Sequence, residues 1–150
     1  MPKLWKKARG KLGPLSPLHG AWVARADSEM GPVTCRRTLQ PVLGGQWLQL
    51  DVRWEFRGGR AYEERALIGA GADGKVGFWS FTSDGKRSQG QAADVTDLHP
   101  EAVGFEAEMP AGLARQAYWP VEGGGFRWVV EARGKKGWRR FVEHEYRAEA

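Results

Sequence analysis

The sequence has little cysteine and no long hydrophobic run. Cys35 is the only cysteine among 150 residues, so an internal disulfide and a multi-cysteine zinc site are both excluded. No apolar stretch approaches the roughly 18 residues that a membrane-spanning helix needs, and no apolar segment of a secretory signal follows the basic first residues. These absences predict a cytoplasmic protein without integral membrane association.

Acidic residues are missing from the first eleven positions, which carry five of the 23 lysines and arginines. The remaining 18 basic residues balance the 18 acidic ones, so the net charge of +5 belongs to this end of the chain. We therefore expect no specific nucleic-acid partner. Residues 1–13 are predicted to form a basic flexible tail, either as a solubilising end or as a weak electrostatic arm for nucleic acid or anionic lipid.

Hydrophobic residues make up 41% of the chain, which is enough for one folded domain that buries a core or lines a small cavity. Glycine-containing breaks recur at regular spacing with no long helical pattern between them, which is typical of an antiparallel barrel or sandwich. Only Leu15–Leu18 and Pro41–Leu43 are expected as short helical turns. Nine strands are expected, at Trp22–Ala26, Val33–Leu39, Trp47–Arg57, Tyr62–Ala70, Val76–Ser83, Val103–Met109, Arg115–Val121, Phe126–Arg133 and Trp138–Arg147.

The segment Trp47–Arg57 alternates strictly between apolar and polar residues, which predicts a strand with one buried face. Asp73-Gly74 and Asp84-Gly85 are strong hairpin turns, because glycine accepts the positive φ of a tight turn. Residues 69–74 match the dinucleotide-binding pattern G-x-G-x-x-G, but a strand pattern follows where that motif needs a helix. We interpret these glycines as part of a hairpin. A closed barrel leaves no unpaired edge strands, so we predict an all-β, single antiparallel barrel of about 8–10 strands over residues 14–150.

Several short motifs resemble the calycin superfamily and a poorly characterised bacterial lipocalin-like family within it. They are Leu18-His19-Gly20-Ala21-Trp22, Leu43-Gly44-Gly45-Gln46-Trp47-Leu48, the central hairpin with Leu67-Ile68-Gly69 and Trp79, and the closing strand with Phe141, Glu143, Tyr146 and Arg147. The resemblance covers residues 15–148. It implies a lipocalin-like barrel with an internal cavity, preceded by a short helical turn, and it implies no established reaction.

Catalytic signatures are scarce. The three histidines, His19, His99 and His144, show no metal-ligand spacing, and no nucleophile elbow is present. Cys35 alternates with Val33, Arg37 and Leu39, which favours packing over reactivity for the thiol. We therefore expect no catalytic residue, no metal and no cofactor. An enzyme of unknown reaction that uses the barrel cavity stays open as an alternative.

Aromatic and basic residues share the expected strands and provide the candidate ligand-binding site. A small barrel either fills its interior with aromatic side chains or leaves room for one ligand. If the parity of the apolar residues faces inward, two arginines and a histidine are buried donors, which need an internal carboxylate such as Glu64 or the acid of a ligand. The candidate residues are Trp54, Trp79, Arg115, Trp119, Trp128, Arg140 and His144.

These residues predict non-enzymatic binding of one small, mostly apolar or amphipathic molecule, lipid-like and with or without an acidic group, by a monomer or homodimer. His144 supports a second interpretation. The resemblance extends to the nitrobindins, which hold haem in the barrel through a histidine near the C-terminus. The chain departs from their glycine-rich opening, since Ala24 and Ala26 follow Trp22.

Overall fold

The computed structural model describes residues 2–149 and confirms an all-β chain folded as one closed antiparallel barrel. A short 3-10 helix, η1, precedes ten strands. The elements are η1 (Gly13–Leu18), β1 (Gly20–Ser28), β2 (Gly31–Val42), β3 (Trp47–Phe56), β4 (Ala61–Ala70), β5 (Val76–Thr82), β6 (Arg87–Ala93), β7 (Val103–Met109), β8 (Gly112–Pro120), β9 (Phe126–Gly134) and β10 (Gly137–Ala148). Met1 and Ala150, the outermost residues of the predicted tail and barrel domain, lie outside the described residues.

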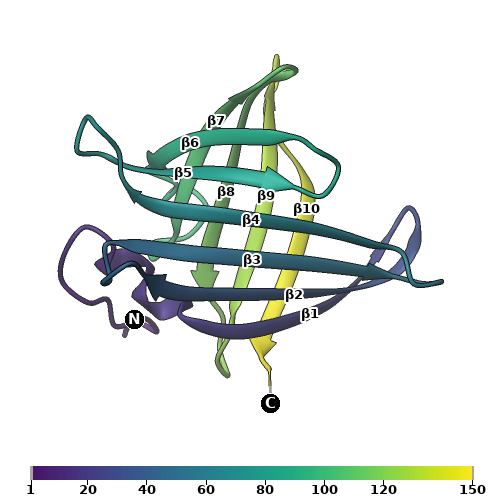
Figure 1. Ribbon diagram of the computed structural model, residues 1–150, viewed down its shortest axis with the longest axis horizontal. Helices are drawn as coiled ribbons and strands as arrows, with labels where there is room; N and C mark the ends of the chain where they lie inside the picture. Colours follow the sequence, from purple (N-terminus) through teal and green to yellow (C-terminus); the bar gives the residue numbers. More distant parts are fainter. Residues whose placement is uncertain (1, 150) are drawn as a thin grey trace.

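Every strand pairs with the next along the chain, and the first pairs with the last. The closing contact sets Val23 of β1 opposite Arg147 of β10. In Figure 1, β1 to β6 run across the view and β7 to β10 run crosswise behind them, so the barrel is strongly twisted. Closure removes the exposed sheet edges that an open arrangement of ten strands would leave. Among the described residues, no helix has the length and apolar character to span a membrane.

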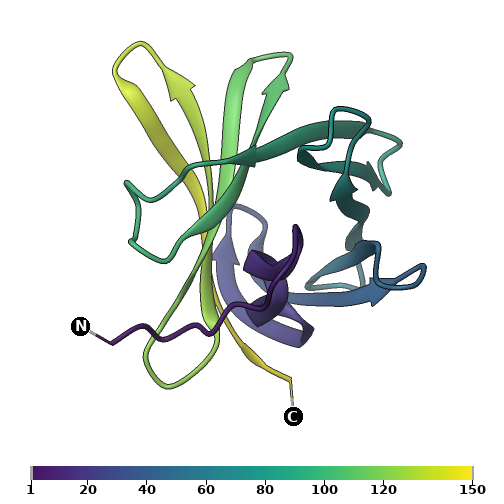
Figure 2. The same ribbon diagram turned by 90° about the vertical axis from the view of Figure 1, so that its left-hand side faces the viewer.

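The barrel core follows the period-two alternation of the strands. In β2 the buried side chains are Val33, Cys35, Arg37 and Leu39, and in β3 the inward set begins with Leu48 and Leu50. One barrel end is closed by η1, whose Leu15 and Leu18 belong to the same hydrophobic cluster. Figure 2 shows η1 lying across this opening. The sequence-predicted helical turn at Leu15–Leu18 is therefore confirmed and serves as a plug.

A smaller hydrophobic cluster lies outside the barrel. Residues 94–102, between β6 and β7, cover the outer face of β8 and β9. Val95 and Ala102 pack there against Trp119 and Val129, and the ring of His99 stacks on Trp119 with 6.1 Å between centroids. As a result, β8 and β9 bury side chains on both faces.

Two local predictions differ from the structure. Strand β6 was not expected, because its sequence, Arg-Ser-Gln-Gly-Gln-Ala-Ala, has no apolar alternation. Its Gly90 is required by packing, since a Cβ there would lie 2.5 Å from the Phe78 ring and 2.3 Å from the Glu106 carbonyl oxygen. The helical turn expected at Pro41–Leu43 is wrong, since β2 continues to Val42 and the turn begins at Leu43, whose φ is +53°.

The basic N-terminal segment contacts the barrel. The backbone N–H groups of Leu4 and Trp5 each donate to the Glu101 carboxylate at 3.0 Å, and these bonds, Leu4's first, lower the pKa of Glu101 despite partial desolvation. The Trp5 side chain packs against the main core. That residues 1–13 form a flexible tail stays a prediction.

Candidate functional site

Polar side chains gather inside the barrel. They come from β2, β4, β5, β8, β9 and β10, which only barrel closure brings around one volume. We call them the inner cluster: Cys35, Arg37, Glu64, Ser80, Gln116, Tyr118, Trp128, His144 and Tyr146.

Arg37 lies at the centre of this cluster. It is only 1% exposed, and its guanidinium carbon lies 4.1 Å from the centre of the Trp128 ring. One terminal nitrogen donates to the Tyr118 hydroxyl, whereas the buried Nε has no hydrogen-bond partner. No carboxylate among residues 2–149 forms an ion pair with Arg37. A buried arginine is charged at any physiological pH, so this interior holds a cation whose charge the ring faces offset only in part.

The neighbours of Arg37 are neutral at neutral pH. Burial raises the pKa of Tyr118 to about 12, against the opposing effect of the Arg37 charge. Burial, helped by that same charge, lowers the pKa of His144 to about 4. Burial also raises the pKa of the Cys35 thiol to about 11, so Cys35 is a packed, unreactive thiol, as its alternation predicted. The cluster therefore offers an arginine cation beside neutral phenol, imidazole and thiol groups, together with the Glu64 carboxylate.

Glu64 is the internal carboxylate that the sequence suggested. It forms no direct ion pair with Arg37, but its charge is among the causes that raise the pKa of Arg37. Its Oε2 accepts a hydrogen bond from the Ser80 hydroxyl at 2.5 Å. Glu64 lies in register with Val52, which in turn lies opposite Arg37, so an intervening strand separates the two backbones. The guanidinium instead reaches toward the rings of β8, β9 and β10.

Inner-face side chains near the barrel end opposite η1 are partly exposed: Trp54, Glu64, Gln116, Val130 and Val142. The His144 ring lies deeper, 5.1 Å from the Trp54 ring and 5.5 Å from the Trp128 ring.

Three of the seven sequence-predicted site residues lie together in this interior. Trp54, Trp128 and His144 form the ring contacts just described, and the Trp128 indole N–H donates to the Gln116 side-chain oxygen at 3.0 Å. The other four lie on the outer face of the barrel.

Arg115 faces outward and all its nitrogens are engaged. Its Nε donates to Glu131 at 2.9 Å, and its two terminal nitrogens donate to the Asp97 carboxylate at 3.1 and 2.9 Å. Its inward direction was predicted from the parity it shares with Ala117 and Trp119. That parity is wrong, because residues 94–102 bury the outer face of β8 as well.

Arg140 also faces outward, because of a β-bulge. The pairing of β10 with β9 shifts between Arg140 and Val142, which puts Arg140 opposite Glu131 while His144 stays opposite the inward Trp128. Arg140 Nε donates to Glu131 at 2.9 Å. The shared parity of Arg140 and His144 that the sequence suggested is therefore wrong.

The two remaining tryptophans pack on the outside. Trp119 belongs to the outer cluster beneath residues 94–102. Trp79 meets the edge of Trp47, with 5.8 Å between ring centroids, in register with Leu67 and Gln89 on the outer face. Neither lines the barrel interior.

The central residue of the cluster, Arg37, was missed as a site residue, although a signal for it was present. It alternates with Val33, Cys35 and Leu39 in the sequence, and a charged residue in such an apolar series is a buried one. Gln116 and Tyr118 alternate with Arg115, Ala117 and Trp119 along β8, so an inward Arg115 would have placed them on the outer face.

His144 does not fit an open axial position for haem. Its ring is packed among Trp54, Trp128 and Tyr146, and its Nδ1 lies 3.5 Å from the Tyr146 hydroxyl. A porphyrin on the imidazole would have to displace these aromatic side chains. Within the described part of the chain, no three His, Cys, Asp or Glu side chains are grouped to hold a metal ion.

His144 predicts a pH dependence of stability. In the unfolded chain its pKa is near 6.5, and in the folded protein it is about 4. Between these values the unfolded chain binds a proton that the folded protein does not, so the free energy of unfolding falls as the pH drops from 6.5 to about 4. The fall is at most about 1.4 kcal/mol per pH unit, or roughly 3 kcal/mol in total.

Chemical denaturation at several pH values measures this effect. Because Asp and Glu titrate in part of the same range, the wild type is compared with His144→Phe, which keeps a ring in the aromatic stack. The variant should lose the slope between pH 6.5 and 5. His19→Gln, at an exposed histidine, should retain it. Equal slopes in the wild type and His144→Phe would contradict a neutral, buried His144.

The fold and the inner cluster define a closed antiparallel β-barrel with an arginine in its interior. No protein-family model matches the chain, and no curated protein does. Among solved structures the chain is similar to a de novo designed, fluorescence-activating beta barrel, with 16% sequence identity, a TM-score of 0.46, and coverage of 94% of this chain and 100% of that one.

Proposed function

We propose that this protein is a lipocalin-like, non-enzymatic binding protein that takes one small, mostly apolar molecule with an acidic group into its barrel. The proposal rests on one observation: Arg37 is buried in the interior, has an unpaired Nε, and forms no ion pair among the described residues. Leaving a buried cation without a directly paired anion is unfavourable, and a ligand carboxylate would supply that partner.

The surroundings of Arg37 support this ligand class. Trp54, Trp128 and the apolar residues of the inner wall suit an apolar body, and a few oriented polar groups give such sites their specificity. A guanidinium binds a carboxylate through two parallel N–H donors, and Arg37 Nε is free to be one of them. The Tyr118 hydroxyl, held by Arg37, is placed to act as a further donor.

A cytoplasmic location belongs to this proposal. Its support is the single cysteine, Cys35, which is fully buried and free, because disulfide-rich chains are typical of oxidising compartments and this chain is not one of them. An enzyme that uses the same interior is the weaker candidate, since the neutral thiol, imidazole and phenols around Arg37 include no paired acid and base.

The test compares two forms of one probe. Dansyl-labelled undecanoic acid carries a negative charge, and its methyl ester replaces that charge with a neutral methyl ester group. We expect the acid to bind more tightly by about 1.5–3 kcal/mol, the usual range for a charge-assisted hydrogen bond, measured as the ratio of the two Kd values by fluorescence titration. Equal affinities would contradict an acid-binding role for Arg37. Native mass spectrometry of freshly purified protein would then identify a natural ligand through its co-purifying mass.

A further inference from the structure

A groove lies on the outside of the barrel, where β6 meets β7. It has a volume of about 850 Å³ and extends from the turn between β4 and β5 to the start of β8, and small-molecule sites measure roughly 300–1,000 Å³. Strands β6 and β7 pair only over Gln91–Ala93 and Gly104–Glu106, and Figure 2 shows β7 and β8 rising away from β5 and β6 beyond this contact. The groove lining includes no residue of the inner cluster, so a ligand in the groove leaves the barrel interior free.

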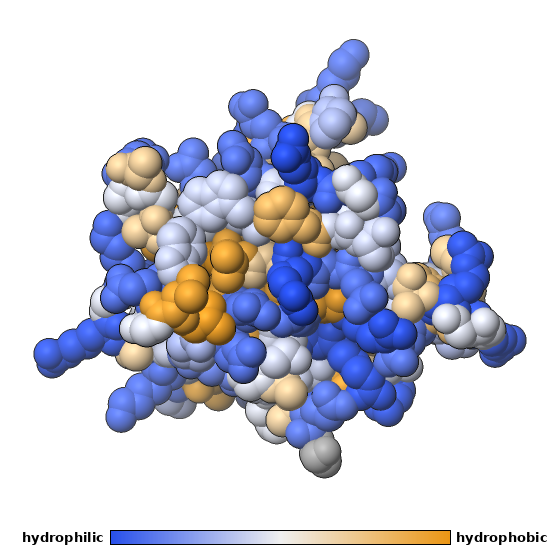
Figure 3. All heavy atoms as spheres, in the orientation of Figure 1, coloured by the Kyte–Doolittle hydropathy of each residue, from blue (hydrophilic) through white to orange (hydrophobic). Residues whose placement is uncertain are grey.

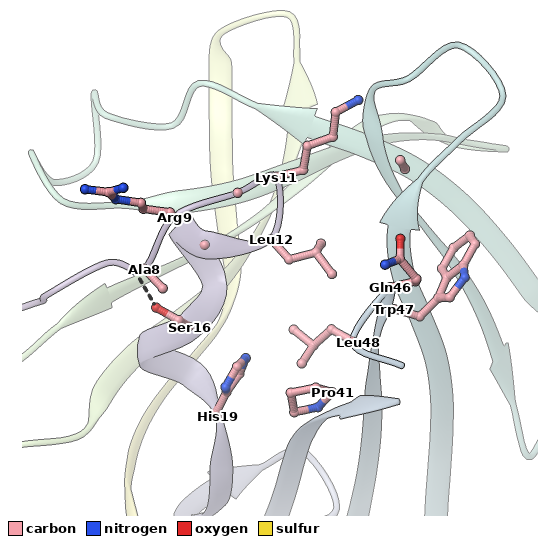
Figure 4. Close-up of a pocket in the computed structure, with 14 residues that line it drawn as sticks. Ala8, Arg9, Lys11, Leu12, Ser16, His19, Pro41, Gln46, Trp47 and Leu48 are labelled. Carbon is pink, nitrogen blue, oxygen red and sulfur yellow. Dashed lines mark hydrogen bonds between the residues drawn. The ribbon is translucent and has the colours of Figure 1, made fainter. Parts of the chain in front are cut away.

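Trp79 of β5 forms one wall of the groove. Its ring lies beside two glycines, since a Cβ added at Gly71 or Gly77 would lie only 3.5 or 3.6 Å from it. On the side toward β3 the ring contacts Trp47, with an angle of 68° between the two ring planes. Trp47 lines a different hollow, beside η1, where Figure 4 shows its side chain pointing away from Leu48. Because Trp47 contacts Trp79 from the β3 side, the side of the Trp79 ring toward β6 is the one that faces the groove.

Three polar side chains lie next to Trp79 on the outer face. Gln89 of β6 lies directly opposite Trp79, and Gln91, two residues further along, lies opposite Glu106 of β7. Directly opposite residues of paired strands point to the same face of a sheet, so these side chains share the outer face with Trp79. Within residues 2–149, none of the three forms a side-chain hydrogen bond or an ion pair, and none is a buried unpaired group. Their polar atoms are therefore accessible to a ligand.

The charge of the groove disfavours an anionic ligand. Its lining carries three carboxylates, those of Asp73, Glu106 and Glu108, against one ammonium group, that of Lys75, although the whole chain has a net charge of +5. Figure 3 shows mainly hydrophilic and intermediate residues over β5 and β6, so a largely apolar molecule would find little apolar surface there. The complementary ligand is hydrophilic, without negative charge, and has one flat apolar face for the Trp79 ring.

We propose that this groove binds a soluble, uncharged oligosaccharide. Each sugar hydroxyl both donates and accepts a hydrogen bond, which matches the donors and acceptors of Gln89 and Gln91 and the acceptor oxygens of Glu106. The C–H face of a sugar ring is apolar, so it stacks on the flat, electron-rich face of the Trp79 ring. A cation is a poorer match, because the N–H donors of the two glutamines need an acceptor and an ammonium group has none.

NMR titration of the full-length protein tests the proposal with four uncharged probes: cellotetraose, maltotetraose, mannotetraose and N-acetylchitotetraose. At least one of these sugars should shift the backbone amides of residues 71–79, 89–93 and 106–113, which line the groove. The same sugar should shift the side-chain NH2 groups of Gln89 and Gln91, because these groups would hydrogen-bond to its hydroxyls.

Variants of the groove separate stacking from hydrogen bonding. Trp79→Ala should weaken binding of that sugar by about tenfold or more, since the stacking surface is lost. Gln89→Ala/Gln91→Ala should weaken it by about tenfold, since the amide partners of the hydroxyls are lost. Gln40→Ala/Gln46→Ala, which removes two exposed glutamines from β2 and the turn that follows it, should leave binding unchanged.

The other outcomes overturn the proposal. No shift from any of the four sugars at millimolar concentration would do so. Unchanged sugar binding by Gln89→Ala/Gln91→Ala would do so as well, and this variant should fold even if the loss of Trp79 destabilises the barrel, because both glutamines are exposed. Shifts confined to the inner cluster would assign the sugar to the barrel interior instead. Shifts from tetramethylammonium chloride, with none from the sugars, would assign the groove to a cation held by Trp79 and the carboxylates.

Discussion

Replacing Glu131 with Gln is expected to destabilise the protein by about 3 kcal/mol or more, the range found when one partner of a buried ion pair is removed. Glu131 is 5% exposed and lies between two arginines. Its Oε1 lies 2.8 Å from an Arg115 terminal nitrogen, and its Oε2 lies 2.9 Å from Arg140 Nε. The amide of the variant keeps the shape but loses the charge, which leaves Arg115 with only the exposed carboxylate of Asp97.

The loss should be seen in thermal denaturation as a fall in Tm of roughly 6–12 °C, given about 2–4 °C per kcal/mol for a domain of this size. Glu145→Gln is the matched control, since Glu145 on β10 also contacts two arginines but is 40% exposed at its side chain. Exposed ion pairs contribute at most about 1 kcal/mol. A Glu131→Gln variant as stable as Glu145→Gln would contradict a structural role for the arginine–carboxylate cluster.

A double variant separates the ion pair from other effects. In Glu131→Gln alone, the buried Arg115 charge loses its partner. The double variant Arg115→Met/Glu131→Gln removes that charge too, so its loss of stability should be smaller than the sum of the losses in the two single variants. This coupling would show that Arg115 is held by Glu131.

The strands could be predicted from the sequence where one face is buried and the other is exposed to solvent. Trp47–Arg57 alternates for this reason, and β3 ends within one residue of the prediction. Strand β6 could not be found in this way. Large rings of neighbouring strands, such as Phe78, occupy the space at its inward positions, so only small residues such as Gly90 fit there. The sequence of β6 therefore lacks the alternating apolar residues that predict a strand.

The candidate site was only partly predictable, because parity tells which residues share a face but not which face is inside. In β8 both faces are buried, one by the barrel and one by residues 94–102, so the apolar pattern around Arg115 gave no direction. In β10 the bulge at Arg140 reverses the parity within the strand, and a sequence carries no clear mark of a bulge. Arg37 could have been identified, because β2 has a single buried face and no bulge.

Replacing Arg37 with Met is expected to abolish the preference for an acidic ligand without loss of stability. Methionine keeps a flexible apolar stem of similar reach and removes the charge. The affinity for dansyl-labelled undecanoic acid should fall by about 1.5–3 kcal/mol, and the affinity for the methyl ester should not change. The free energy of unfolding without ligand should hold or rise by about 1–4 kcal/mol, since replacing buried ionic groups with apolar ones is neutral or stabilising.

Measuring both stability and acid binding in Arg37→Met distinguishes a structural role of Arg37 from a ligand-binding role. A structural role predicts a loss of stability, and a ligand-binding role predicts a loss of acid binding. If its contacts with the Trp128 ring and the Tyr118 hydroxyl satisfy the arginine within the fold, Arg37→Met should lose stability and bind the acid as tightly as the wild type. If the Arg37 cation binds the acid of a ligand, the Arg37→Met variant should lose affinity for the acid and keep its stability. Arg25→Met, which removes one exposed positive charge from β1, controls for net charge and should change neither quantity. An Arg37→Met variant that is less stable by about 2 kcal/mol, with undiminished acid binding, would make the arginine a structural residue.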